Sequence, residues 1–209
     1  MITIDLDEKI NTETPLWFII EQKLIKIYDD IRLVDAIKSQ MNDKKPPVIL
    51  TLVTVHYLNN FKKLLFGRMI KFKSKIDLLS KNSIENGLKD CRIIKCIQYM
   101  IDDGFLMFFC MFLIVKKVLY DECESQLIFC TAWGLDLNSV RMLEMLIIQV
   151  MDYKFNITLK TVKESIYDIY GNGKVKIKKK SNNFHKRIIP KRFLCAFDKM
   201  FSNIPCYKF

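Results

Sequence analysis

The sequence predicts an all-α protein, and three observations support this. Glycine and proline are scarce, at 6 and 5 of 209 residues, as in proteins built from long helices rather than many short strands and turns. Apolar residues recur at steps of three and four over long stretches, as they do on one face of a helix. Half of the residues are hydrophobic, so the chain can bury a sizeable core as one domain.

The first helices are indicated by capping signals and by apolar spacing. Thr14-Pro15 predicts a helix start, because threonine is a common N-cap and proline suits the first helical turn. Apolar residues continue at helical spacing to Val34, which predicts one amphipathic helix. A second helix is expected from Pro46-Pro47 to about Leu65. Residues 66–82 are basic and less periodic, which predicts a loop or a broken helix.

The middle of the chain holds the segment that decides the architecture. Asn82-Ser83 is expected to cap a helix running to Asp102, which Gly104 would end in a left-handed turn. The following run, residues 105–119, is apolar nearly all round. Such a helix suits a central position with other helices wrapped around it. We therefore expect a five-helix bundle around this apolar helix, with a further helix on its N-terminal side.

Two more helices are expected after the central one. A short helix near 123–132 should stop at Gly134, since glycine readily adopts the left-handed conformation that ends a helix. Asp136 or Asn138 is then expected to cap a helix over 138–152.

The net charge of +11 is concentrated at one end of the sequence. Residues 171–209 hold eleven Lys and Arg against one acid, whereas residues 1–170 hold 23 basic and 22 acidic side chains. A last short helix over Val162–Tyr170 precedes this change. We therefore expect an N-terminal helical extension at 1–45, a helical domain at 46–170 and a basic C-terminal tail at 171–209.

Membrane insertion and secretion are not expected. The densest apolar run, Phe105 to Val115, is much shorter than the roughly 20 residues that cross a bilayer. The N-terminus lacks the pattern of a signal peptide. Seven cysteines form no CxxC pair and make an odd number, which favours a reducing compartment. We expect an intracellular protein of the nucleus, the cytoplasm or both.

Catalysis is not expected either. Of the two histidines, His56 sits in an apolar helical run and suits a satisfied core or surface residue better than a base. The sequence has no glycine-rich phosphate loop, no HExxH and no metal-ligand spacing. The prediction is a protein that is not an enzyme, with no catalytic residue, no metal and no cofactor.

Residues 117–155 carry a run of features with a specific order and spacing. Twenty-seven positions separate Lys117 from Glu144, and nine separate Glu144 from Tyr153. In chain order the features are KVLYD at 117–121, ESQ at 124–126, Phe129, GLDL at 134–137, LE at 143–144 and DYKF at 152–155.

This segment resembles the cyclin box, and most of all the box of the P/U-type cyclins, the group that includes the phosphate-pathway cyclins. Their pattern of K-F-L-D-D, Y-S-N, an aromatic, G-I-S-L, L-N-x-L-E and D-F/W has the same spacing. Three departures bear on partner specificity more than on fold. Arg141 stands where the family usually has Asn, Tyr120 replaces the first acid of the pair, and the turn at Asp103-Gly104 is shorter than the family's linker.

The resemblance implies a non-catalytic regulatory subunit that binds and activates a cyclin-dependent protein kinase, in cell-cycle or nutrient-linked control. In cyclins the third and fifth box helices pack against the kinase's mobile regulatory helix and favour its active conformation. By position, Lys117 and Glu144 would form the polar pair that bonds kinase backbone, and Ile148 and Tyr153 would be apolar contacts. Lys117 and Glu144 also suit structural roles, and Lys116 is the competing lysine if the register slips by one.

The basic tail supports an alternative function. A helical nucleic-acid-binding or transcription-associated protein would use such a tail to contact phosphates. The tail also suits a nuclear-import signal or a merely solvated segment. The candidate import residues are Lys178, Lys179, Lys180, Lys186 and Arg187.

Overall fold

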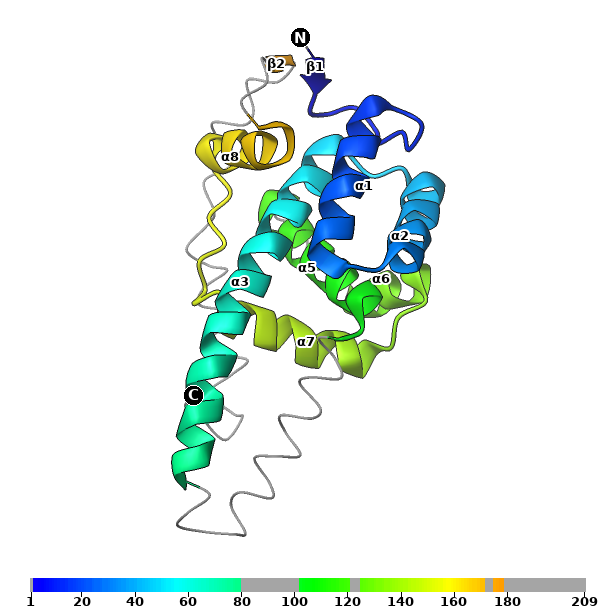
Figure 1. Cartoon of the computed structure of the whole chain (residues 1–209). Helices are drawn as coiled ribbons and strands as arrows, with labels where there is room; N and C mark the ends of the chain where they lie inside the picture. The colour runs from blue at the N-terminus through cyan, green and yellow to red at the C-terminus, as the bar shows by residue number, and fades with distance from the viewer. Residues whose placement is uncertain (1, 80–101, 121–124, 172–174, 179–209) are drawn as a thin grey trace.

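The computed structural model describes residues 2–79, 102–120, 125–171 and 175–178 (Figure 1). Helices dominate these ranges, which confirms the all-α prediction. The helix expected from Ser83 lies outside the described residues up to residue 101. In chain order the elements are β1 (Ile2–Asp5), α1 (Pro15–Tyr28), α2 (Ile31–Lys44), α3 (Val48–Leu79), α5 (Gly104–Tyr120), α6 (Gln126–Trp133), α7 (Leu137–Val150), α8 (Leu159–Tyr170) and β2 (Val175–Lys178).

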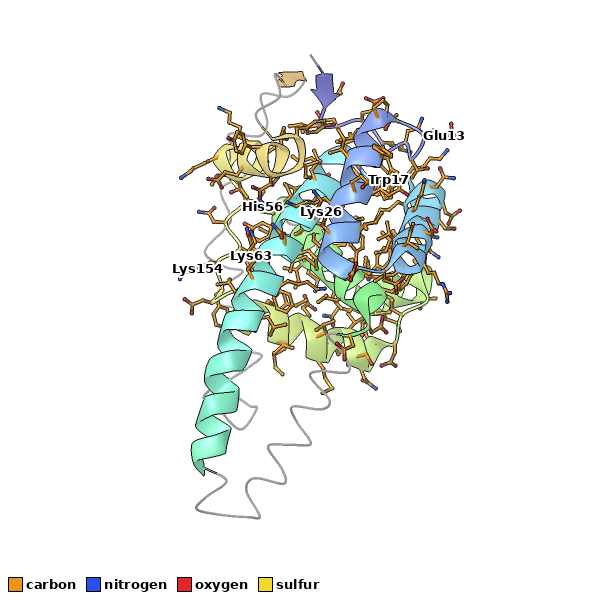
Figure 2. All side chains as sticks on the ribbon, viewed as in Figure 1. Glu13, Trp17, Lys26, His56, Lys63 and Lys154 are labelled. Atoms are coloured by element: carbon orange, nitrogen blue, oxygen red, sulfur yellow. The ribbon has the colours of Figure 1, made fainter. Side chains whose placement is uncertain are left out.

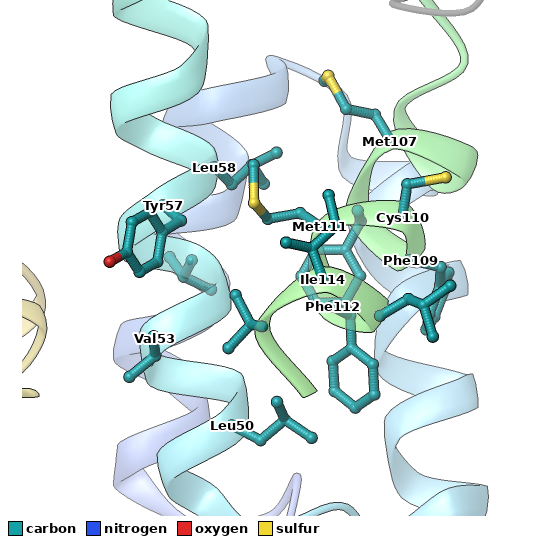
Figure 3. Packing of buried hydrophobic residues seen from close by; sticks show 14 of the residues in the cluster. Leu50, Val53, Tyr57, Leu58, Met107, Phe109, Cys110, Met111, Phe112 and Ile114 are labelled. Atoms are coloured by element: carbon teal, nitrogen blue, oxygen red, sulfur yellow. The ribbon is translucent and has the colours of Figure 1, made fainter. Parts of the chain in front are cut away.

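Helix α5 occupies the centre of the molecule, as its composition predicts. Every residue from Leu106 to Val115 is buried, so no side of this helix faces solvent over that stretch. It packs against α3 along most of its length and also against α7 and α2. Figure 3 shows Leu58 of α3 and Met111 of α5 side by side in this interface. Each large side chain buried here contributes on the order of 1.5–3 kcal/mol.

The N-terminal segment forms two helices, so the prediction of one helix from Thr14 to Val34 is wrong. Thr14 does cap α1, as expected, with its hydroxyl accepting from the Trp17 backbone N–H at 3.5 Å. The helix ends at Asp29, which has a left-handed backbone with φ of 56°. Asp30 then caps α2 by accepting from two backbone N–H groups at 2.9 and 3.2 Å. Two consecutive aspartates thus break the helix.

Helix α3 continues to Leu79, so the prediction of a loop or a broken helix over 66–82 is wrong up to residue 79. The segment is rich in Lys, Leu and Ile and holds no proline, and its one glycine, Gly67, is tolerated inside the helix. Figure 1 shows that the C-terminal half of α3 extends beyond the other described helices.

Gly104 begins α5 instead of ending the preceding helix in a left-handed turn, which corrects the prediction. A Cβ at this position would lie 2.3 Å from Leu33 Cδ2 and 2.8 Å from Tyr28 Cε1. Tyr28 has little room to move, since the Lys62 ammonium lies 4.5 Å from its ring centroid. Glycine is therefore required because the corner between α1 and α2 packs directly on the start of α5.

The signals for the later helices are confirmed. Gly134 ends α6 with φ of 64°, and Asp136 caps α7 by accepting from the Ser139 backbone N–H at 2.7 Å. Helix α7 stops at Val150, two residues before the predicted end. Asp152 and Tyr153 follow with left-handed φ values of 56° and 57°.

Two short strands, which the sequence analysis did not predict, pair in parallel. In this pair Ile2 lies opposite Val175 and Asp5 lies opposite Lys178. The start of the basic tail is therefore placed beside the N-terminal segment. Trp17 of α1 and Ile37 of α2 belong to the same apolar core as α5.

Within the described ranges, no helix combines the length and hydrophobicity that crossing a bilayer requires.

The close approach at Gly104 makes a prediction about stability. Gly104→Ala should lower the free energy of unfolding by about 1–3 kcal/mol, because the new methyl overpacks the contact with Tyr28 and Leu33. The matched control is Gly67→Ala, where an added Cβ meets no heavy atom within 4 Å. That control should raise the free energy by about 0.5–1 kcal/mol. Urea denaturation measures both, and equal stabilisation by the two substitutions would contradict the packing described.

Candidate partner-binding site

The structure brings Lys117 and Glu144 together. Lys117 Nζ donates to Glu144 Oε1 at 2.6 Å, so the C-terminal end of α5 is tied to the middle of α7. The two side chains are 13% and 6% exposed, respectively, which makes this a largely buried ion pair. A buried pair of this kind is stable only when both charges have good hydrogen-bond partners.

A second polar contact completes the coordination of Glu144. Gln126, the first residue of α6, donates from Nε2 to Glu144 Oε2, so both carboxylate oxygens are engaged. Gln126 in turn accepts from Arg141 Nε at its Oε1, at 3.3 Å. One chain of hydrogen bonds thus runs from Lys117 through Glu144 and Gln126 to Arg141. It joins α5, α6 and α7.

The local fold explains why these residues meet. Helix α5 is apolar until its last turn, where Lys117 can direct its ammonium out of the core. Gly134 then turns the chain sharply after α6, and the Asp136 cap starts α7 two residues later. Helix α7 packs against α5, with Val140 and Leu143 buried in the core. Glu144 follows at the edge of that buried face.

The negative charge of Glu144 also affects a neighbouring thiol. Burial raises the pKa of the Cys110 thiol well above its usual range, and Glu144 raises that pKa further. The Cys110 Sγ donates to the Val140 carbonyl at 3.9 Å. Cys110 and Cys130 are free thiols, and both are buried. Cys110 therefore remains a neutral thiol at physiological pH and acts as a small core residue.

The other two predicted contact residues occupy different environments. Ile148 lies on α7, one helical turn after Glu144, and is buried. Tyr153 lies beyond the end of α7 and is 48% exposed. Its backbone N–H donates to the Ile148 carbonyl at 3.0 Å, so the left-handed turn holds Tyr153 at the end of the helix. The structure thus places Ile148 within α7 and Tyr153 just beyond its end.

Helix α6 adds an exposed apolar pair that the sequence analysis missed. Leu127 and Ile128 are 59% and 62% exposed, although both are large aliphatic residues. The same helix buries Phe129 and Cys130. The signal was present in the sequence: an eight-residue helix with apolar residues on every side must expose some of them unless another chain covers it.

Only one of the candidate import residues is in the described part of the tail. Lys178 ends β2, opposite Asp5. The candidates Lys179, Lys180, Lys186 and Arg187 lie outside the described residues.

His56 lies on α3 (Figure 2), and both of its ring nitrogens have hydrogen-bond partners. Its Nδ1 lies 2.6 Å from Asp168 Oδ2, and Asn60 Nδ2 lies 3.1 Å from its Nε2. The histidine thereby joins α3 to α8.

Comparisons with family models, with curated proteins and with solved structures gave no match for this chain.

The buried pair makes a prediction that a double-mutant cycle can test. Lys117→Met or Glu144→Leu alone should lower the free energy of unfolding by about 3–5 kcal/mol, because each leaves a charge buried without its partner. The double variant should lose much less than the sum of the two single variants.

The control is the pair of Lys38 and Glu21, which are 3.2 Å apart and more exposed. The same substitutions there should show a coupling free energy below about 1 kcal/mol. If the coupling free energy between Lys117 and Glu144 were as small as that between Lys38 and Glu21, the burial of the Lys117–Glu144 pair would be contradicted.

Proposed function

We propose that this chain is a non-catalytic regulatory subunit of the cyclin type, which binds and activates a cyclin-dependent protein kinase. The observation that carries the proposal is the contact between Lys117 and Glu144 at 2.6 Å. The resemblance to P/U-type cyclins pairs these two positions, 27 residues apart, before any coordinates are considered. The central position of α5 and its packing against α7 support the same proposal.

The geometry suits recognition of a partner's backbone. The Lys117 ammonium has three N–H donors, and its recorded bond to Glu144 uses one of them. A backbone carbonyl of the kinase can accept another. The Glu144 carboxylate holds the ammonium in place, so little side-chain entropy is lost when the partner binds. The exposed Leu127 and Ile128 add apolar surface that a partner can cover.

Activation then follows from differential binding. A subunit that prefers the active kinase conformation shifts the kinase population toward it by the difference in affinity. A shift from 1:99 to 99:1 requires about 5.5 kcal/mol. Two charge-assisted hydrogen bonds, at about 1.5–3 kcal/mol each, together with a few apolar contacts are of the right size to supply it. The proposal involves no cofactor and no chemistry on this chain. It places the chain inside the cell, where the kinase is found.

The proposal is tested by recovery of a kinase from the source cell. The tagged chain should co-purify with a protein kinase whose activity on a peptide substrate rises when the chain is added. Lys117→Met/Glu144→Leu, which removes both charges together, should reduce that recovery at least about tenfold, the effect of losing 1.4 kcal/mol of binding.

The matched control is Lys38→Met/Glu21→Leu, which removes the more exposed ion pair between α1 and α2 and should bind as the unmodified chain does. Circular dichroism confirms that each variant is folded. Recovery of no kinase, or equal recovery with the two double variants, would overturn the proposal.

The alternative proposal is nucleic-acid binding through the tail, which is favoured by the eleven basic residues against one acid in 171–209. Truncation after Lys178 separates the two proposals, because it keeps β2 and removes residues 179–209. We expect the truncated chain to bind the kinase as before. If the tail binds nucleic acid, the affinity for duplex DNA should fall steeply with salt and be lost on truncation. Loss of kinase binding on truncation would show that the kinase binds the tail and not the surface around the ion pair.

A further inference from the structure

Arg141 is an exposed cation at one end of the hydrogen-bonded chain that includes Lys117 and Glu144. Its Nε donates to Gln126 at 3.3 Å, and the described residues provide no other hydrogen bond to its guanidinium. A guanidinium carries five N–H donors in a planar fork. The donors of its two Nη groups are therefore available to a ligand, while the bond from Nε restrains the side chain.

No carboxylate among the described residues forms an ion pair with Arg141. Lys117 and Glu144 neutralise each other across 2.6 Å. Asp136, the nearest acid before Arg141 in α7, caps the helix by accepting from the Ser139 backbone N–H. This hydrogen bond lowers the pKa of Asp136, so the carboxylate is held at the helix start. The Arg141 guanidinium is therefore open to an ion pair with a carboxylate of a partner.

Apolar surface lies next to this charge. Arg141, Met145 and Ile148 are spaced at i, i+4 and i+7, which places them on one side of α7 together with Glu144. Met145 is half-buried, so part of it remains in contact with solvent. The exposed Leu127 belongs to α6 and directly follows Gln126, the residue that holds Arg141. Ile148 is buried, so the apolar groups near this cation that a partner can reach are the exposed Leu127 of α6 and the partly exposed Met145 of α7.

We propose that Arg141 selects a partner whose docking helix carries a carboxylate beside its apolar face. This inference rests on the proposed function and adds the chemistry of the partner to it. A carboxylate can pair with the guanidinium in a bidentate arrangement that lysine cannot reproduce.

The first test uses the full chain and two synthetic probes, and it does not require the kinase. One probe is a short amphipathic helical peptide with glutamates flanking a leucine face, and the other has glutamines at the same positions. The glutamate peptide should shift the Arg141 Nε–Hε resonance and bind at least about fivefold more tightly, as expected for one exposed charge pair. The difference should disappear in Arg141→Gln. Equal binding of the two peptides, or no shift with either, overturns the inference.

The second test measures the affinity of the purified kinase. Arg141→Gln should weaken binding about tenfold, Arg141→Lys should restore part of the loss, and Arg141→Glu should weaken binding further. The control is Arg32→Gln, which removes an exposed arginine of α2 and should change nothing.

The two proposals fail in different ways. If Lys117→Met/Glu144→Leu abolishes kinase binding while all Arg141 variants bind normally, the inference about Arg141 is wrong and the proposed function stands. If no kinase binds the unmodified chain, the proposed function fails, and the peptide titration alone decides the role of Arg141.

Discussion

The burial of α5 is the constraint on which the rest of the structure depends. A helix that is apolar on every side over Leu106–Val115 must be covered on every side, so α2, α3 and α7 all pack against it. Two of the covering helices, α2 and α3, precede α5 in the sequence, and α7 follows it. The apolar run of α5 ends at Val115, and the charged residues Lys116 and Lys117 follow it directly. The position of the candidate site follows from that placement.

Glu144 neutralises the charge of Lys117, and the hydrogen bonds that the buried Glu144 carboxylate needs explain the rest of the polar chain. A carboxylate that is 6% exposed requires partners for both oxygens, and Lys117 and Gln126 supply them. Gln126 can do so because α6 begins at that residue and packs against α7. The ion pair therefore fixes the relative positions of three helices, whatever else it does.

Local signals in the sequence were sufficient for much of the fold. The apolar run of α5, the Thr14 cap, the Gly134 stop and the Asp136 cap each act within a few residues, and each is found where expected.

The errors arose where two local signals competed or where distant segments meet. Apolar spacing continued across Asp29-Asp30, although Asp30 was also a good N-cap, and the cap prevailed. Gly104 was expected to end a helix because glycine does so often. It is needed instead for a contact with Tyr28, 76 residues earlier in the chain. The pairing of β1 with β2 joins the two ends of the described chain, and a pattern within one segment cannot reveal it.

The candidate site also depends both on local sequence signals and on contacts between segments that are distant in the sequence. The resemblance to the cyclin box implies a pair of Lys117 and Glu144, and the structure places the two side chains in contact. The sequence analysis expected both residues to face a partner, whereas Glu144 is almost fully buried. Its hydrogen bond to Gln126, and the link from Gln126 to Arg141, depend on how α6 packs against α7. No periodicity or motif contains that information.

Burial of Glu144 changes how a partner would be recognised. A carboxylate held by an ammonium and an amide is already in its bound orientation, so it supplies rigidity rather than selectivity. The Lys117 ammonium, which keeps unused donors, can bind any backbone carbonyl and therefore does not discriminate between partners. Discrimination then falls to the exposed groups around the pair, which are the apolar Leu127 and Ile128 and the cationic Arg141. Under the proposed function, partner specificity is thus expected at these exposed groups, while the buried ion pair holds the three helices in place.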